Sequence, residues 1–271
     1  MPHVLAILFC CFICTAHAAP TQLILAVHPY LPVAEINTRF SPLAHYLEQE
    51  TQRPVVIRVG RNYAEHIHSI GSDRVDIAYM GPVPYVKTVQ QYGKKPLLAR
   101  QEIKGQPFLR GVIFVRQESP IQTLAALKGR RFAFGDPDST MSHVVPLRML
   151  EMAGVPEISL GHFDFLGAHK NVALAVLIGD YDAGAVKQEV FDEMAHKGLR
   201  ALAVSPAVPD HLFIASTKLE PALQETLRNA KRGVRARQPS STSRTMRGSA
   251  RHRCPARPSP TPISRAAPVP G

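Results

Sequence analysis

Residues 134–143 have the sequence FGDPDSTMSH, which is typical of the passage from a strand to a helix. The apolar run before this segment ends at Gly135, and three hydroxyl side chains, Ser139, Thr140 and Ser142, follow where a helix begins. The first N–H groups of a helix have no partner within it, and the helix dipole makes that end positive. The segment therefore predicts a strand, a loop and a helix whose start receives an anion.

The simpler alternative is that this cluster only caps a helix. One hydroxyl, that of Ser139, is explained by capping alone. Three hydroxyl groups within four residues are explained less well by a cap. Both interpretations stay open at this point.

Short apolar runs and helical stretches alternate over residues 23–228, which predicts an α/β fold with largely parallel sheets. One helix is expected over Thr140–Ala153 with Gly154 as its stop, and another from Pro42 with Ser41 as its N-cap. The expected strands are Leu23–Val27, Val55–Val59, Val75–Met80, Gly111–Arg116, Arg131–Gly135, Ala183–Val186, Ala201–Val204 and Leu212–Ala215.

Two further segments end a strand with a turn and then start a helix. They are residues 76–85, DIAYMGPVPY, and residues 167–171, GAHKN, which come before a helical run. Each is weak evidence alone, because Gly-Pro turns are common. Together with the first segment they predict a cleft lined by loops.

Around Asp76–Tyr85, Gly135–Pro146 and His169–Val186 the sequence resembles the phosphate/phosphite/phosphonate-binding proteins of ABC transporters. The resemblance extends over about residues 23–227. It implies the type II periplasmic binding-protein fold, a two-lobed α/β protein whose ligand cleft lies between the lobes and closes on the ligand.

The resemblance also implies a division of the chain into two lobes. We expect the first lobe over residues 19–107 and the second over residues 108–206. Residues 207–230 would return to the first lobe without completing it, because a basic tail follows. We therefore expect the first lobe to lose packing and to be marginally stable.

The resemblance implies that neutral donors and helix ends hold the ligand, rather than a Lys/Arg pocket. Ser139 and Thr140 would donate to phosphoryl oxygens, and His169 would face the ligand. The family's third hydroxyl position holds Met141 here, with Ser142 next. The expected ligand contacts are Tyr30, Tyr79, Tyr85, Ser139, Thr140, Ser142, His169 and Asp182.

Several of these contacts have alternatives. Asp182 would pair with a ligand amine or accept from a protonated oxygen. A lone histidine such as His169 at a helix start can instead be a cap, and Tyr85 can be part of the core. Only one of Tyr79 and Tyr85 needs to face the ligand.

The net charge of +11 gives no support to a nucleic-acid partner for the folded part of the chain. Residues 231–271 hold ten basic residues and no acidic ones, and removing them leaves 22 basic against 21 acidic residues, a net of +1. This Pro-, Arg- and Ser-rich tail is either disordered or, as we favour, the product of a frameshift.

The amino terminus predicts export to the periplasm. An apolar run over residues 4–14 is too short to cross a bilayer and ends at the small-x-small sequence of residues 16–18. We expect residues 1–18 to be a cleaved signal peptide, the alternative being a buried first element. Three of the four cysteines lie within it and Cys254 lies in the tail, so a disulfide framework and a thiolate zinc site are excluded from the core.

The predicted function is a periplasmic solute-binding component of an ABC transporter that delivers a phosphonate, phosphite or phosphate anion to a membrane permease. The alternative is a sensor that presents the anion to a membrane kinase or chemoreceptor. Neither a nucleophile elbow nor a phosphate loop is present, so we do not expect an enzyme or a cofactor. Glu65, His66 and His68 could suggest a metal site, but His66 and His68 are two residues apart and diverge on a helix, so we expect no metal site. We also expect a monomer.

Overall fold

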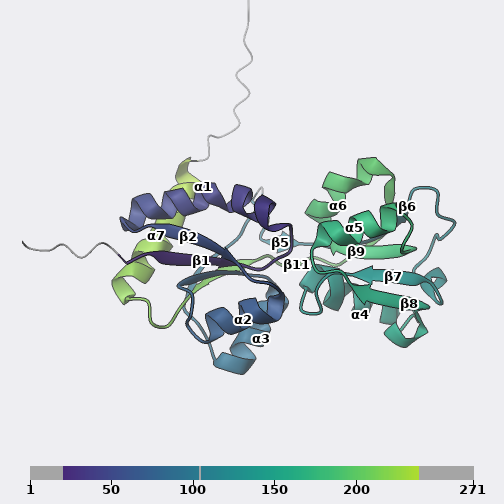
Figure 1. The fold of residues 1–271 in the computed structure, drawn as a ribbon, viewed down its shortest axis with the longest axis horizontal. Helices are drawn as coiled ribbons and strands as arrows, with labels where there is room; N and C mark the ends of the chain where they lie inside the picture. The colour runs from purple at the N-terminus through teal and green to yellow at the C-terminus, as the bar shows by residue number, and fades with distance from the viewer. Residues whose placement is uncertain (1–20, 104, 238–271) are drawn as a thin grey trace, which may run out of the picture.

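The computed structural model describes residues 21–103 and 105–237. It consists of two lobes side by side, each built on a five-stranded sheet with helices on both faces, as Figure 1 shows. The expected amino-terminal signal and most of the basic tail lie outside the described residues. Among the described residues, no helix combines the length and apolar character that crossing a bilayer requires.

The first lobe has the strand order β2-β1-β3-β12-β4, with β1 parallel to β2 and β3 and with β12 antiparallel to both of its neighbours. Helices α1 and α7 cover one face of this sheet, and α2 and α3 cover the other (Figure 1). The bounds are β1 Leu23–Val27, α1 Val33–Thr51, β2 Val55–Val59, α2 Tyr63–Gly71, β3 Ile77–Met80, α3 Pro82–Tyr92, β4 Leu97–Arg100, β12 Leu212–Ala215 and α7 Pro221–Arg237.

The second lobe has the strand order β10-β6-β9-β7-β8, in which β7 is parallel to β8 and β9. Helices α5 and α6 lie on one face and α4 on the other (Figure 1). The bounds are β6 Gly111–Arg116, β7 Arg131–Phe134, η2 Thr140–Val144, α4 Val145–Met152, β8 His162–Phe165, α5 His169–Leu177, β9 Ala183–Lys187, α6 Gln188–Met194 and β10 Leu199–Val204. Three single 3-10 turns, Ala125–Leu127, Glu157–Ser159 and Ala195–Lys197, complete it.

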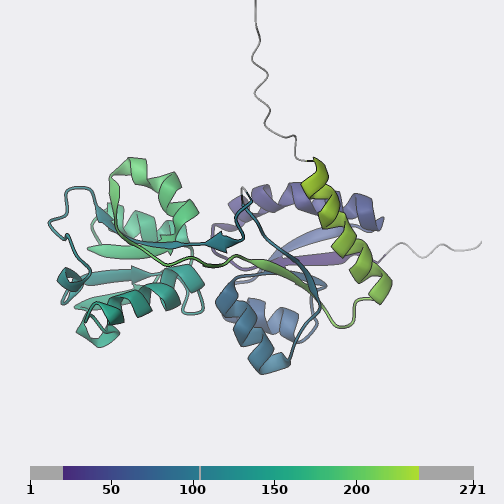
Figure 2. The same cartoon turned by 180° about the vertical axis from the view of Figure 1, so that it is seen from behind.

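Two antiparallel segments join the lobes. Strand β5, Phe108–Leu109, leads into the second lobe, and β11, Val208–Pro209, leads back to the first. Figure 2 shows the two segments crossing between the lobes side by side. A pair of crossing segments of this kind is suited to serve as a hinge between two lobes.

The carboxyl ends of the parallel strands determine where functional loops gather. Strands β1 and β3 of the first lobe and β7 and β9 of the second end at the boundary between the lobes. Ligands of open α/β sheets bind at such ends. The fold therefore brings four strand ends to one place.

The eight expected strands are all present, four of them with the expected bounds, but β4, β5, β8 and β11 were not expected. The helix expected over Thr140–Ala153 is confirmed, although it begins with the π-helical turn η2. The helix start expected at Ser41 and Pro42 is wrong, because helix α1 begins at Val33.

The apolar stripe of α1 explains this correction. Ile36, Phe40, Ala44 and Leu47 are buried at spacings of three and four residues, so the helix continues through Pro42. Burial of this face outweighs the hydrogen bond that proline removes. Helix α7 likewise continues to Arg237, beyond the expected start of the tail.

Candidate functional site

A small cavity lies between the lobes at these strand ends. Both lobes contribute to its lining, together with the connecting strand β5. The lining residues are His28, Tyr30, Tyr63, Gly81, Leu109, Ser139, Thr140, Met141, His169, Lys187 and His211.

The loop of residues 135–142 forms one wall of the cavity. Ser139 caps the helix, because its Oγ accepts from the N–H of Ser142 at 3.2 Å. Gly135 is required for this turn, since a Cβ there would lie 2.5 Å from the Ser142 Oγ. The next residues, Thr140 and Met141, line the cavity with the first turn of the helix, whose N–H groups have no partner within it. π-helical turns of this kind often occur at functional sites.

His169 and Ser139 form a defined pair of donor and acceptor. The backbone N–H of Lys187 donates to His169 Nδ1 at 3.1 Å, so Nδ1 is unprotonated and Nε2 carries the hydrogen. His169 Nε2 then donates to Ser139 Oγ, 3.1 Å away. Because Ser139 Oγ accepts twice, its own hydrogen is available to the neighbouring Tyr63 phenol or to a bound anion.

Burial keeps His169 neutral. Desolvation, followed by the charges of Lys187 and His211, lowers the pKa of His169 to about 3. The neutral ring has one donor and one acceptor, and both are used. His169 therefore positions Ser139 instead of contributing a charge.

Lys187 supplies a positive charge to the lining. Its side chain is 5% exposed, its Nζ lies 3.0 Å from Glu189 Oε2, and it lies 5.9 Å from the centre of the Tyr30 ring. The sequence prediction of a cleft without Lys or Arg is wrong. Strand β9 continues one residue beyond the expected end at Val186, so Lys187 occupies the strand end next to the cavity.

Two further histidines lie on the first-lobe side. His28 and His211 have nearly parallel rings 5.2 Å apart, and each ring is also nearly parallel to that of Tyr79. His28 Nδ1 donates to the carbonyl oxygen of Tyr79 at 3.1 Å, and His211 Nδ1 donates to Asp210 Oδ1 at 2.8 Å. In the neutral rings, each Nε2 remains an acceptor.

The pKa values of these two histidines are also lowered. Burial and then the other histidines hold the pKa of His28 well below its usual range. Burial lowers the pKa of His211 to about 4, although Asp210 acts in the opposite direction. The sequence signal for both was their position, one residue outside a strand end, but this signal is common in proteins.

Contacts between the lobes hold the site closed. The N–H of Val83 donates to Thr140 Oγ1 at 3.0 Å, and the N–H of Tyr63 donates to Asp136 Oδ2 at 3.1 Å. The N–H of His169 donates to the carbonyl oxygen of Tyr30 at 2.9 Å. The cavity walls are therefore fixed to each other by backbone donors.

The eight expected contact residues do not all meet at the cavity. Tyr30, Ser139, Thr140 and His169 line it. Tyr79 lies behind His28 and His211, and its hydroxyl donates to Gln101 Oε1.

Ser142, Tyr85 and Asp182 are placed elsewhere, which corrects three expectations. The Ser142 hydroxyl donates to the carbonyl oxygen of Ala185. Tyr85 packs against an apolar cluster of the first lobe. Asp182 precedes β9, at the opposite end from Lys187, where it pairs with Arg131 at 2.8 Å. Asp182 and Lys187 lie at opposite ends of β9, so only one of them can reach the cavity. The spacing of residues in the sequence does not show which end of the strand faces the cavity.

Among the described residues, no group of three or more His, Cys, Asp or Glu side chains has the arrangement of a metal site. The triplet considered from sequence disperses on α2. Glu65 pairs with Arg61, His66 Nε2 lies 3.1 Å from the Tyr79 carbonyl oxygen, and His68 Nδ1 lies 2.9 Å from the Tyr92 hydroxyl.

Comparison with known proteins agrees with this geometry. Residues 25–247 match a family described as the periplasmic substrate-binding protein of phosphonate ABC transporters. The phosphate-import protein PhnD of Mycolicibacterium smegmatis is 27% identical over 231 residues, 79% of this chain and 72% of that protein. A probable phosphite-binding protein, PhnD1, of Prochlorococcus marinus is 24% identical over 202 residues, 68% of this chain and 66% of that protein.

Solved structures show the same fold. PhnD1 from Prochlorococcus marinus, in complex with methylphosphonate, matches with a TM-score of 0.71 and 21% identity, over 77% of this chain and 83% of that one. A binding component of a phosphonate transporter from Pseudomonas aeruginosa matches with a TM-score of 0.71 and 20% identity, over 78% and 74% of the two chains. The expected type II fold is thus confirmed. The matched residues make up most of the sequence, and the chain belongs to the family of periplasmic substrate-binding proteins of phosphonate ABC transporters.

Proposed function

We propose that this protein binds a phosphorus oxyanion, a phosphonate, phosphite or phosphate, in the cavity between its lobes and delivers it to an inner-membrane permease. A member of this family carries its ligand to a transporter and does not convert it, in agreement with the expectation that the chain is not an enzyme. We further propose that it acts as a monomer in the periplasm after loss of residues 1–18.

The observation that carries the proposal is the Ser139 hydroxyl, which lines the cavity. Its oxygen already accepts from two donors, so its hydrogen can turn from the Tyr63 phenol to a bound anion. Lys187 provides a buried charge beside it, and the start of the helix adds backbone donors. A tetrahedral anion with three acceptor oxygens matches this set.

The other side of the cavity offers acceptors. In their neutral forms, His28 and His211 each retain an unprotonated Nε2. A fully ionised phosphate would meet unfavourable lone pairs there, whereas a protonated oxygen would donate to them. The arrangement favours an anion that keeps a hydroxyl group or binds together with a proton.

The test is calorimetric titration of residues 19–271 with methylphosphonate, phosphite, phosphate and sulfate. We expect micromolar or tighter binding of a phosphorus anion. The double variant Ser139→Ala with Thr140→Ala should weaken it at least 100-fold, because two hydroxyl groups are lost.

The control is Thr38→Ala with Ser41→Ala on α1, whose hydroxyls donate to carbonyl oxygens of their own helix. This pair should bind as the wild type does. Equal affinity of both double variants, or a folded wild type that binds none of the phosphorus anions, would overturn the proposal.

A further inference from the structure

A second, larger cavity adjoins the first. It is partly open to solvent, and it shares Tyr30 and Lys187 with the first cavity. The two cavities therefore meet at the Tyr30 ring and the Lys187 side chain. A group that extends from a ligand in the first cavity toward the second would pass along these two side chains.

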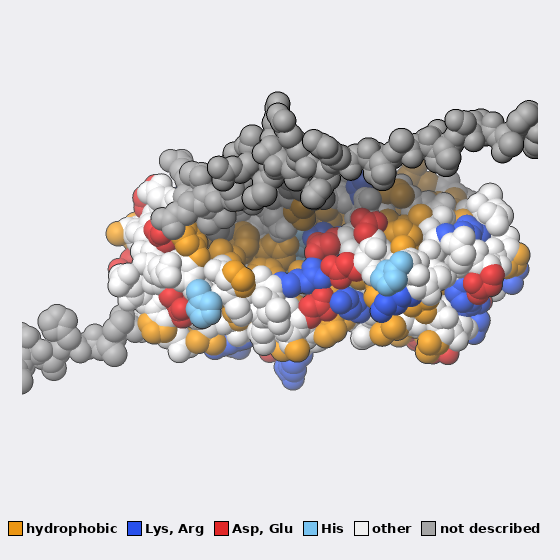
Figure 3. Space-filling model, turned by 90° about the horizontal axis from the view of Figure 1, so that it is seen from above, with side chains coloured by type: hydrophobic (Ala, Val, Ile, Leu, Met, Phe, Trp, Pro, Cys, Tyr) orange, Lys and Arg blue, Asp and Glu red, His pale blue; other side chains and the backbone are white. Residues whose placement is uncertain are grey.

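The second cavity has an apolar floor. Phe40 and Leu43 of α1 and Phe213 of β12 line it, together with the rings of Tyr30 and Tyr79. Phe40, Phe213 and Tyr79 are at most 9% exposed, so their packing fixes this floor. On the face in Figure 3, hydrophobic side chains lie in a hollow beside a band of acidic and basic side chains.

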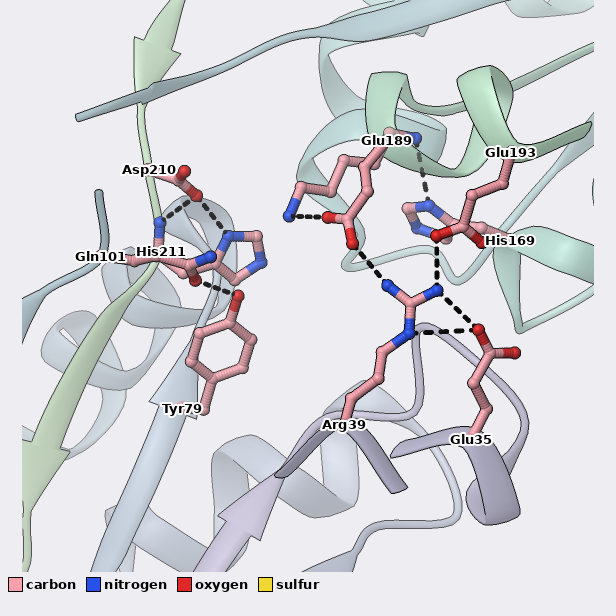
Figure 4. A network of polar contacts seen from close by, with 10 residues as sticks. Glu35, Arg39, Tyr79, Gln101, His169, Glu189, Glu193, Asp210 and His211 are labelled. Atoms are coloured by element: carbon pink, nitrogen blue, oxygen red, sulfur yellow. Dashed lines mark hydrogen bonds and ion pairs between the residues drawn. The ribbon is translucent and has the colours of Figure 1, made fainter. Parts of the chain in front are cut away.

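The charged wall of this cavity is neutralised by ion pairs. Glu189 pairs with Lys187 at 3.0 Å and with Arg39 at 2.5 Å. Figure 4 shows Arg39 pointing toward Glu189, Glu193 and Glu35. Arg39 also bonds Glu35 and Glu193, and Lys170 bonds Glu35 at 2.6 Å. Three basic and three acidic side chains form this network.

This balance decides which substituent the second cavity accepts. A cationic substituent would compete with Arg39 and Lys187 for Glu189, which already pairs with both. An anionic one would lose its hydration without gaining a free partner. An alkyl or aryl group gives up no hydrogen bonds to water when it enters the second cavity, and it buries the apolar side chains of the floor.

We infer that the second cavity receives an uncharged alkyl or aryl substituent of an organophosphonate whose phosphonate group occupies the first cavity. The inference rests on the proposed function, and it narrows the ligand to a substituted phosphonate. Each methylene group buried on the floor strengthens binding by about fourfold.

The test compares ligands that differ only in the substituent, by calorimetry on the wild-type protein. Hexylphosphonate should bind at least tenfold tighter than methylphosphonate. Propylphosphonate should bind at least fivefold tighter than 2-aminoethylphosphonate, which has the same length but carries a charge.

A variant that fills the second cavity tests whether the gain in affinity arises there. Leu43→Trp should weaken hexylphosphonate at least tenfold and change methylphosphonate by less than threefold. The control is Gln49→Trp, at an exposed position of the same helix. It should leave both affinities unchanged.

Failure of the inference differs from failure of the proposed function. The inference alone would be overturned if the wild-type protein bound methylphosphonate and bound hexylphosphonate no more tightly. A preference for 2-aminoethylphosphonate over propylphosphonate would overturn it as well. Protein that binds neither methylphosphonate, phosphite nor phosphate would overturn the proposed function and the inference with it.

Discussion

At the scale of single residues, Lys187 has two roles. Its backbone N–H fixes the tautomer of His169, and its ammonium group lies beside the cavity where we place the anion. Burial raises the pKa of the neighbouring Glu189, but the charges and hydrogen bonds of Lys187 and Arg39 outweigh this effect and lower it. Glu189 is therefore ionised and holds the ammonium group in place.

Replacing this charge tests its contribution to binding. Lys187→Met should weaken methylphosphonate about 100-fold in a calorimetric titration, because a buried charge-assisted contact is lost while the backbone N–H remains. The control is Lys170→Met, in the same ion-pair network but outside the first cavity, which should change affinity less than threefold. Similar losses in both variants would mean that Lys187 acts only through the network.

Half of the contact residues expected from the sequence line the cavity, and the residues that were not expected are those whose place depends on orientation. Ser139, Thr140 and His169 are found because helix starts and strand ends can be recognised in the sequence. Lys187, His28 and His211 reach the cavity only through the direction of their strands and the approach of the two lobes. Neither property is visible in local spacing.

At the scale of the elements, α1 connects the two lobes. Arg39 on this helix bonds Glu189 and Glu193 of α6, and Glu35 bonds Lys170 of α5. These side chains are about a quarter to a third exposed. The network contributes to closure, but solvent screens it.

Removing Arg39 should therefore favour the open protein. Arg39→Met should enlarge the radius of gyration of the ligand-free protein in small-angle scattering and weaken anion binding about three- to tenfold. Arg148→Met is the control, since Arg148 pairs with Glu151 within α4. An unchanged radius and affinity for Arg39→Met would show that backbone contacts alone close the lobes.

The same helix contains a local conflict between sequence and structure. Pro42 lies inside α1, where it cannot donate to the preceding turn. This conflict is why the local signals predicted a helix start at Ser41, whereas the longer apolar stripe of buried residues begins before it. Long-range packing against the sheet determined the result.

Pro42→Ala should stabilise the protein. Pro42 is exposed, so the substitution restores a backbone hydrogen bond without disturbing the core. We expect a gain of about 1–3 kcal/mol in the free energy of unfolding in urea. Pro82→Ala, at the first position of α3, should give no such gain, because proline is suited to that position. Equal effects of both substitutions would contradict this account.

At the scale of the whole molecule, four histidines that are buried in the described part of the chain make folding depend on pH. Burial lowers the pKa of His169 to about 3 and those of His66 and His211 to about 4, and it also lowers the pKa of His28. In the unfolded chain these rings gain protons near pH 6.5. Their contribution to stability is therefore full above pH 6.5 and is lost as the pH falls toward the folded values.

Urea unfolding at pH 7.0 and pH 5.5 checks this dependence. We expect a loss of at least about 2 kcal/mol at the lower pH, since each histidine contributes up to about 1.4 kcal/mol per pH unit. His66→Gln keeps a donor toward Tyr79 and should reduce the loss. Equal stability at both pH values would contradict the lowered pKa values.

The same unfolding curves test the prediction that the first lobe is marginally stable. A cooperative transition at an ordinary midpoint would contradict that prediction.

The central claim is that a phosphorus oxyanion occupies the cavity between the two lobes. A crystal structure of residues 19–271 grown with methylphosphonate tests it most directly. We predict a phosphonate group within hydrogen-bonding distance of Ser139 Oγ and Lys187 Nζ, with the lobes closed around it. A phosphonate bound only outside the cavity, or a cavity that contains only water at saturating ligand, would contradict the claim.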